Sequence, residues 1–234
     1  MLPAHSALLR CPHCGALKEV LQLMSGNTFG AILWSDAKQI APMLPRVSYI
    51  QRCPNCGKYF FYTQEVEAGT SNNYGGGTGD LPLEYLKQAL TQLQPTGNEE
   101  HILRINILWA FNDRYGDMEQ SDIPIEEWAY HVDNVHHLVQ MDIDALLRAE
   151  LFREIGDFDK AIQILQSHEV ADNLKDLQRQ LLQQSQQHNR KVFALYGDIQ
   201  RSVLTLDKYK EKPYTPSQDD DADSRDLFLT PIDF

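Results

Sequence analysis

The chain has 234 residues and a formal net charge of −12, with 42% hydrophobic residues. This length suits one large domain or two small ones and allows a hydrophobic core. The negative charge argues against non-specific nucleic-acid binding and against attraction to anionic membranes, because both require an excess of Lys and Arg. The sequence shows no apolar run of about 18 residues and no signal-peptide pattern at its start. We therefore expect a cytoplasmic protein, in a reducing compartment where disulfides do not persist.

All four cysteines belong to two motifs of the form C-P-x-C-G, LLRCPHCG at residues 8–15 and RCPNCG at residues 52–57. The proline stiffens each loop, and the glycine accepts the positive φ at which the chain turns back. Two such pairs supply four thiolates, the tetrahedral ligand set of structural Zn²⁺ sites. The predicted metal ligands are Cys11, Cys14, Cys53 and Cys56. Four cysteine ligands leave no coordination position for a catalytic water.

Other uses of these cysteines are less consistent with the sequence. Thioredoxin-like redox chemistry needs one C-x-x-C within a βαβ pattern, which the sequence lacks. A disulfide pair is disfavoured by the expected compartment. A rubredoxin-like iron site uses the same four ligands, so spacing alone leaves it open. His13 lies within the first motif and is expected to point away from the metal, and His5 is a ligand only if it displaces a cysteine.

The segments on either side of the second motif, VSYIQR and KYFFYTQEVE, are rich in β-branched and aromatic residues and predict a β-hairpin. The motif then lies at the hairpin tip. Residues 8–67 resemble the zinc-ribbon domains that carry paired CPxCG motifs. The resemblance implies a structural zinc ion and no particular chemistry, since ribbons serve many functions. Residues 15–52 separate the two pairs, which exceeds the about 15–20 residues of a compact ribbon, so this insert must hold structure of its own.

Within the insert, AILW predicts a short strand. We expect Trp34, Met43 and Leu44 to form an apolar patch that covers the thin core of the ribbon beside the metal, or alternatively a peptide-binding groove. The segment AGTSNNYGGGTGDLP that follows the ribbon lacks the lysine of a P-loop and the strand–helix–strand context of a Rossmann motif. We interpret residues 69–81 as a flexible glycine-rich linker between a ribbon domain, residues 1–68, and a helical domain, residues 82–206.

The helical domain is predicted from apolar residues at helical spacing. Pro82 and Pro124 occupy first-turn positions, and Gly116 ends a helix whose residues 102–111 are apolar nearly all round, which predicts a central, buried helix. Residues 145–166 are expected to form a helix–turn–helix unit, and the other expected helices cover residues 81–94, 98–115, 124–140 and 170–195. The last has a narrow apolar stripe, so self-association through it is a hypothesis.

Residues 145–166 resemble a tetratricopeptide repeat, a helix–turn–helix unit of about 34 residues. The matching positions are Ala149, Phe152, Gly156, Asp157, Phe158, Ala161 and Leu165. The family's final small residue and proline fall on His168 and Asn173, so the end of the repeat departs from the pattern. Residues 106–117 form a degenerate echo of residues 146–157. Since a solenoid needs three or more repeats, we expect a compact helical bundle with repeat-like packing.

No catalytic constellation is present, and no enzymatic activity is predicted. His131, His136 and His137 cluster on one helix without the H-E-x-x-H spacing of a metal site, and are expected to be exposed or hydrogen-bonded. Residues 207–234 form an acidic tail that is expected to be mostly disordered, with an apolar end that docks on its own domain or on a partner.

The sequence therefore predicts an α+β protein, with a small N-terminal β zinc ribbon and a C-terminal all-α, tetratricopeptide-like bundle. It resembles bacterial proteins that join a CPxCG ribbon to such helices, from which no activity carries over. The expected function is that of a non-catalytic zinc-binding module or adaptor in protein–protein interaction. The alternative is a nucleic-acid or transcription-associated ribbon, although Arg10, Lys18, Lys38, Arg46, Arg52 and Lys58 are dispersed.

Overall fold

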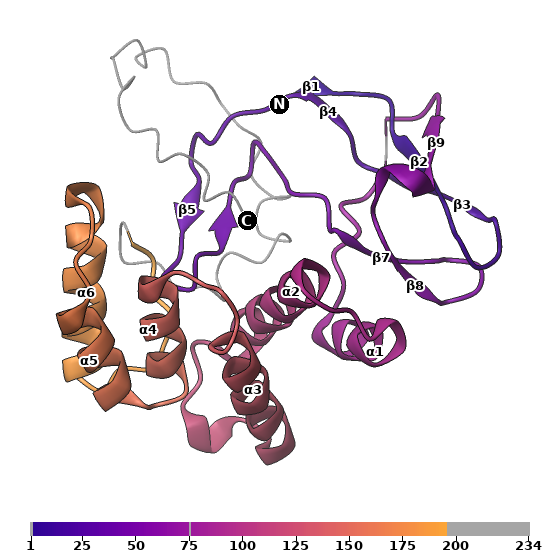
Figure 1. The fold of residues 1–234 in the computed structure, drawn as a ribbon. Helices are drawn as coiled ribbons and strands as arrows, with labels where there is room; N and C mark the ends of the chain where they lie inside the picture. The colour runs from indigo at the N-terminus through magenta and orange to yellow at the C-terminus, as the bar shows by residue number, and fades with distance from the viewer. Residues whose placement is uncertain (1, 75, 196–234) are drawn as a thin grey trace, which may run out of the picture.

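The computed structural model describes residues 2–74 and 76–195. Short antiparallel strands occupy the N-terminal part and helices the remainder, so the predicted mixture of β and α structure is confirmed (Figure 1). The end of the helical domain at residue 206 and the acidic tail, residues 207–234, lie outside the described residues.

The strands form four small antiparallel sheets. Their orders are β1–β4, β3–β2–β9, β5–β6 and β7–β8. The strands are β1 (Leu2–Pro3), β2 (Ala7–Arg10), β3 (Leu17–Val20), β4 (Leu23–Ser25), β5 (Ile32–Leu33), β6 (Gln39–Ile40), β7 (Ile50–Arg52), β8 (Tyr59–Phe61) and β9 (Glu67–Thr70). Both cysteine motifs connect the strands of a hairpin, β2–β3 and β7–β8, with Arg10 opposite Leu17 and Arg52 opposite Tyr59.

Six α-helices lie within the described residues, together with three single 3₁₀ turns. The helices are α1 (Leu83–Leu93), α2 (Asn98–Tyr115), α3 (Ile125–Leu138), α4 (Ala145–Glu154), α5 (Phe158–Ser167) and α6 (Lys175–Gln186). The 3₁₀ turns are η1 (Gln64–Val66), η2 (Gln120–Asp122) and η3 (Asp172–Leu174). As expected, α2 is central and ends immediately before Gly116, and it contributes residues to both large helical cores.

The glycine-rich segment after β9 packs against the ribbon, which differs from its interpretation as a flexible linker. Gly77 forms a β-bridge with Val20, and the backbone N–H of Gly76 donates to Ser6 Oγ at 2.9 Å. A Cβ atom on Gly76 would lie 2.3 Å from the carbonyl carbon of Val20. Gly76 therefore allows backbone to approach backbone, and β9, which overlaps residues 69–81, pairs with β2.

The β7–β8 hairpin packs directly on α1. Ile50 and Tyr59 share a buried cluster with Leu83, Leu86 and Ala89 of the helix. Figure 1 shows α1 beside β7 and β8. The ribbon and the helices thus share one hydrophobic core at this contact.

The β5–β6 part of the insert packs against residues 192–195, so the expectation that Trp34 covers the ribbon core is wrong. Trp34 is fully buried with Val192 and Ala194, two residues near the end of the described chain. The backbone continues this contact, because Trp34 and Ala194 form an antiparallel bridge and Leu195 N donates to Leu33 O at 2.9 Å. Burying the large aromatic ring of Trp34 is strongly favourable, and distant residues bury it here in place of its neighbours in sequence.

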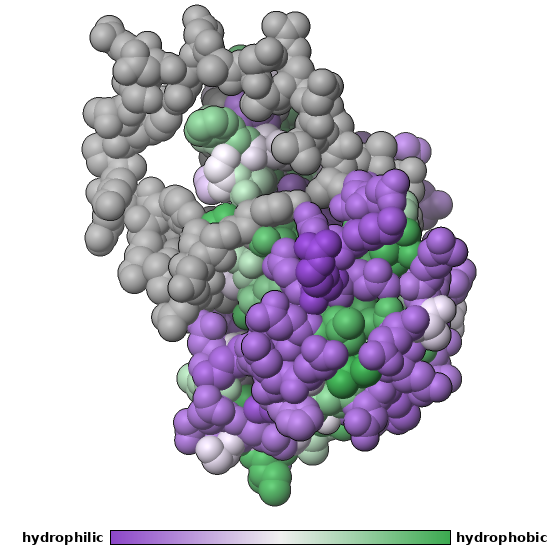
Figure 2. Space-filling view, turned by 90° about the vertical axis from the view of Figure 1, so that its left-hand side faces the viewer, coloured by the Kyte–Doolittle hydropathy of each residue, from purple (hydrophilic) through white to green (hydrophobic). Residues whose placement is uncertain are grey.

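Helices α4, α5 and α6 pack against one another in chain order, with Ala149 and Ala161 fully buried. The last helix is shorter than the predicted range of residues 170–195. It ends at Gln186, His188 has a positive φ of 54°, and Val192 and Ala194 lie outside the helix and pack against Trp34. The side of the molecule on which α5 and α6 lie is mostly hydrophilic, with limited hydrophobic areas between the polar side chains (Figure 2).

Candidate metal centre

The two cysteine motifs fold into loops of the same geometry. In the first, Cys11 N donates to Ala16 O at 2.9 Å and Gly15 N donates to Cys11 O at 2.9 Å. In the second, the equivalent bonds join Cys53 N to Lys58 O at 2.8 Å and Gly57 N to Cys53 O at 3.0 Å. The glycines have φ values of 73° and 72°, a left-handed conformation that glycine adopts without strain. Each loop thereby directs two sulfurs to the same side.

The four sulfurs meet in one cluster. Cys11 Sγ lies 3.7 Å from Cys56 Sγ, and Cys14 Sγ lies 3.6 Å from Cys53 Sγ. All four lie within 4.8 Å of one another. Four sulfurs at about 2.3 Å from a tetrahedral ion are about 3.8 Å apart, whereas a disulfide bond is about 2.05 Å long. The four cysteines are therefore arranged to bind a metal ion.

The surroundings shift the pKa values of the Cys11, Cys14 and Cys53 thiols in different directions. Burial raises the pKa of the Cys11 thiol to about 11. The backbone N–H of Ala16 and the side-chain amide of Asn55 lower the pKa of the exposed Cys14 thiol to about 6. Burial opposes ionisation of Cys53, but the backbone N–H groups of Cys56 and Asn55 lower its pKa. A metal ion must displace the remaining thiol protons, so metal affinity falls as the pH is lowered.

Neither histidine near the motifs belongs to the cluster. His13 Nε2 lies 3.1 Å from Tyr59 O, and His5 Nε2 lies 3.0 Å from the hydroxyl of Tyr74. Over residues 2–74 and 76–195, the four cysteines are the sole group of three or more potential ligands close enough to share an ion. The ligand set is therefore all sulfur, as the motifs predict.

Helix α1 holds the β8 end of the second loop. The backbone N–H of Tyr59 donates to Gln92 Oε1 at 3.3 Å, and Gln92 Nε2 donates back to Tyr59 O at 3.2 Å. The hydroxyl of Tyr59 donates to Gln88 Oε1 at 2.8 Å. Since Tyr59 O is also the partner of His13, one residue joins both loops to the helix. Sequence reasoning missed this, because the glutamines of α1 carry no motif.

The three clustered histidines do not form a site. His136 and His137 are exposed on α3, as expected. His131 differs from the expectation, because it is buried and its ring stacks on Phe111 with the centroids 3.9 Å apart. Its Nδ1 has no hydrogen-bond partner among the residues that the structure describes.

No protein-family model, curated protein or solved structure matches this chain. Among the helices of the described residues, none has the length and apolar character needed to cross a lipid bilayer.

Proposed function

We propose that the four cysteines bind one structural Zn²⁺ ion, and that the metal-stabilised ribbon supports a helical module for protein–protein interaction. The observation that carries the proposal is the sulfur cluster, whose separations of 3.6 and 3.7 Å fit tetrahedral zinc. A ligand sphere of four thiolates is closed, so the ion stabilises the fold and has no open position for substrate. Iron with the same ligands is the competing metal.

The burial of two small residues between α4 and α5 supports the interaction role. Ala149 on α4 and Ala161 on α5 are both fully buried in a helix pair, as the small positions of a tetratricopeptide-like unit require. Such units present helices as binding surfaces for other proteins. We propose that α4, α5 and α6 form this module.

The basic residues of the ribbon half favour this function over nucleic-acid binding. Arg46 and Arg52 stack over Trp109 and Tyr85, and Lys38 pairs with Asp113. Lys18 Nζ donates to Arg52 O at 3.4 Å. Arg10, Arg46 and Lys58 are exposed. Three exposed cations on a chain of net charge −12 make a weak surface for phosphates.

Elemental analysis and cobalt substitution test the metal assignment. Protein purified without chelators should contain one zinc per chain, and the Co²⁺ form should show the intense visible spectrum of tetrahedral thiolate coordination. Cys53→Ser should lose both, whereas Lys58→Ser, in the same loop, should keep both. Stoichiometric iron with a reversible redox transition would replace zinc in the proposal, and absence of any metal would reject it.

The interaction role needs a separate experiment. Cross-linking in native cells followed by mass spectrometry should place the cross-links to a partner protein on α4, α5 and α6 in the metal-loaded protein. Cross-links confined to the ribbon loops, or cross-links to nucleic acid, would contradict this assignment of the surface.

A further inference from the structure

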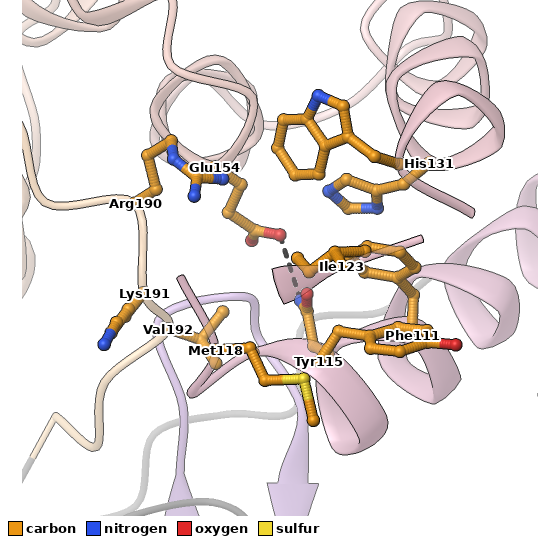
Figure 3. Close-up of a pocket in the computed structure, with 12 residues that line it drawn as sticks. Phe111, Tyr115, Met118, Ile123, His131, Glu154, Arg190, Lys191 and Val192 are labelled. Atoms are coloured by element: carbon orange, nitrogen blue, oxygen red, sulfur yellow. Dashed lines mark hydrogen bonds between the residues drawn. The ribbon is translucent and has the colours of Figure 1, made fainter. Parts of the chain in front are cut away.

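The cavity between α2, α3 and α4 is too small to bind a metabolite (Figure 3). Its volume is about 20 Å³, whereas one water already needs about 10–15 Å³. Arg190 lines this cavity, and its guanidinium group lies 4.7 Å from the ring centroid of Trp128, another lining residue. The polar side chains beside the four sulfurs offer more, because two of them reach from one cysteine motif to the other.

A centre of four thiolates and one divalent ion is a net anion. Each thiolate contributes one negative charge, and the ion balances only half of the total. Cys11 and Cys53 are buried, so part of this charge is withdrawn from water. Buried charge is unfavourable unless opposite charges or hydrogen-bond donors lie next to it. The residues around the sulfurs therefore have to supply such groups.

Lys18 brings a cation from the first hairpin to the second motif. The residue lies on β3, and its Nζ donates to the backbone oxygen of Arg52 at 3.4 Å. Arg52 directly precedes Cys53 in the chain. Burial lowers the pKa of Lys18, and the negative charge of Cys53 raises it. A partly buried ammonium group of one hairpin is thus held next to a buried thiolate of the other.

Asn55 makes the reciprocal contact from the second motif to the first. It is the variable residue of the second C-P-x-C motif, and its Nδ2 donates to Cys14 Sγ at 3.6 Å. Within the second loop, the backbone N–H of Cys56 donates to Cys53 Sγ at 3.5 Å. Each motif therefore receives a polar side chain from the opposite hairpin.

The other cations next to the motifs have different surroundings. The guanidinium group of Arg52 lies 4.8 Å from the ring centroid of Tyr85 on α1. Arg10 and Lys58 are exposed, and salt and water screen the charge of exposed groups. Lys18 is partly buried and contacts the chain next to a ligand, so its charge is screened less.

We propose that Lys18 is a positioning residue of the metal centre, whose ammonium group balances the charge of the thiolates and raises the affinity of the site for a divalent ion. This inference rests on the proposed function, since it requires that the four cysteines bind a metal. Asn55 supports the same centre through its hydrogen bond to Cys14. Loss of a residue that supports a metal ligand typically lowers metal affinity about 10–100-fold.

Competition with a chromophoric chelator measures the zinc dissociation constant of the full chain. Lys18→Gln should raise this constant about tenfold or more, whereas Lys18→Arg, which keeps the charge, should stay close to wild type. Lys58→Gln is the matched control, because it removes the same charge from an exposed position in the second loop. It should change the constant less than about twofold. Equal effects of Lys18→Gln and Lys58→Gln, or no effect of Lys18→Gln, would overturn the inference.

The same titration separates this inference from the proposed function. A wild-type chain that binds no metal rejects both. A wild-type chain that binds one zinc, with unchanged affinity in Lys18→Gln, rejects the role of Lys18 alone.

Iron in place of zinc gives a result that a merely structural role of Lys18 would not produce. The ferrous centre carries one more negative charge than the ferric centre, so a nearby cation stabilises the ferrous form. Lys18→Gln should therefore lower the reduction potential of the iron-loaded chain, and Lys18→Arg should restore it. A potential that is the same in wild type and Lys18→Gln would contradict the charge-balancing role.

Nuclear magnetic resonance on the zinc-loaded wild-type protein gives a result even if Lys18→Gln does not fold. Nuclear Overhauser contacts should join the ε-methylene of Lys18 to the β-methylene of Cys53. A Lys18 side chain that instead shows only contacts to solvent would reject its placement at the metal centre.

Discussion

Asn112 donates a hydrogen bond from Nδ2 to Asp36 Oδ2 at 2.9 Å, although the two residues are 76 positions apart in the sequence. Both are buried, and Asp36 is 0% exposed. The same amide nitrogen donates to Glu154 Oε2, and Trp109 Nε1 donates to Asp36 O at 3.0 Å. One side chain of α2 therefore connects the insert between the two cysteine motifs to α4.

Replacement of Asn112 by leucine is expected to destabilise the protein by about 3 kcal/mol or more, because the carboxyl groups of Asp36 and Glu154 each lose a buried hydrogen-bond donor. Asn106→Leu is the matched control on α2, since the amide of Asn106 donates to Ile102 O of its own helix. It should cost less than about 1 kcal/mol. Urea denaturation of both variants measures their free energies of unfolding. If both variants lose the same amount, the hydrogen bonds of Asn112 to the two carboxyl groups contribute little to stability.

Glu154→Gln is expected to stabilise the protein above about pH 4.3, where a glutamate in the unfolded chain ionises. Burial keeps the folded-state pKa well above the usual range, with further contributions from Glu150 and Asp36. The stabilisation that Glu154 contributes to the wild-type protein is therefore fully present below the pKa that Glu154 has in the unfolded chain. This stabilisation is lost as the pH rises toward the pKa that Glu154 has in the folded protein. The advantage of the variant should be small at pH 4 and grow by at most about 1.4 kcal/mol per pH unit.

Denaturation at pH 4, 6 and 8 measures this advantage. Glu119→Gln serves as a control of opposite sign, because the hydrogen bond from Lys191 lowers the pKa of that exposed carboxyl group. Its substitution should reduce stability slightly at neutral pH. A difference between Glu154→Gln and wild type that does not change with pH would show that Glu154 is ionised in the folded protein.

Cys53→Ser should abolish metal binding and unfold the ribbon, since a structural zinc contributes about 10–16 kcal/mol of apparent free energy. Because Tyr59 is bonded to Gln88 and Gln92, protection of α1 amides should also decrease. The amides of α4 and α5 should remain protected. Hydrogen exchange resolves these segments, with Lys58→Ser as the control. Full protection of the β2 and β7 amides in the variant would show that the ribbon folds without the metal.

The glycine-rich segment offers a sharp comparison between adjacent residues. Gly76→Ala places a methyl group against the backbone of Val20 and should cost about 1–3 kcal/mol. Gly77→Ala is the control, since its Cβ would approach only Gly79 N, at 3.9 Å, which is an ordinary contact. Thermal unfolding of the two variants decides the case. If both behave as wild type, the segment is a flexible linker after all.

Features that depend on short-range chemistry could be predicted from the sequence. The C-P-x-C-G spacing determines the loop that brings Cys11 and Cys14 to one side, and the same holds for Cys53 and Cys56. The ends of α1 and α2 follow from local signals such as Pro82 and Gly116.

Contacts between distant segments could not be predicted in this way. The sequence around Trp34 does not indicate that Val192 packs against it, and the sequence around Asp36 does not indicate a hydrogen bond from Asn112. Such contacts depend on how distant segments come together in the folded core. Glycines are ambiguous for another reason. The same residue permits a flexible linker and a close approach of two backbones, so the contact of Gly76 with Val20 leaves no distinct pattern in the sequence.

The burial of Trp34 against Val192 and Ala194 also sets an order of events during synthesis. Both cysteine motifs emerge from the ribosome early, so the ribbon can close on its metal while the helices are still being made. The indole of Trp34 has to wait until residue 194 has left the exit tunnel. During that interval an exposed aromatic ring is available to chaperones, and its fluorescence on stalled nascent chains of increasing length would report when the last segment closes over it.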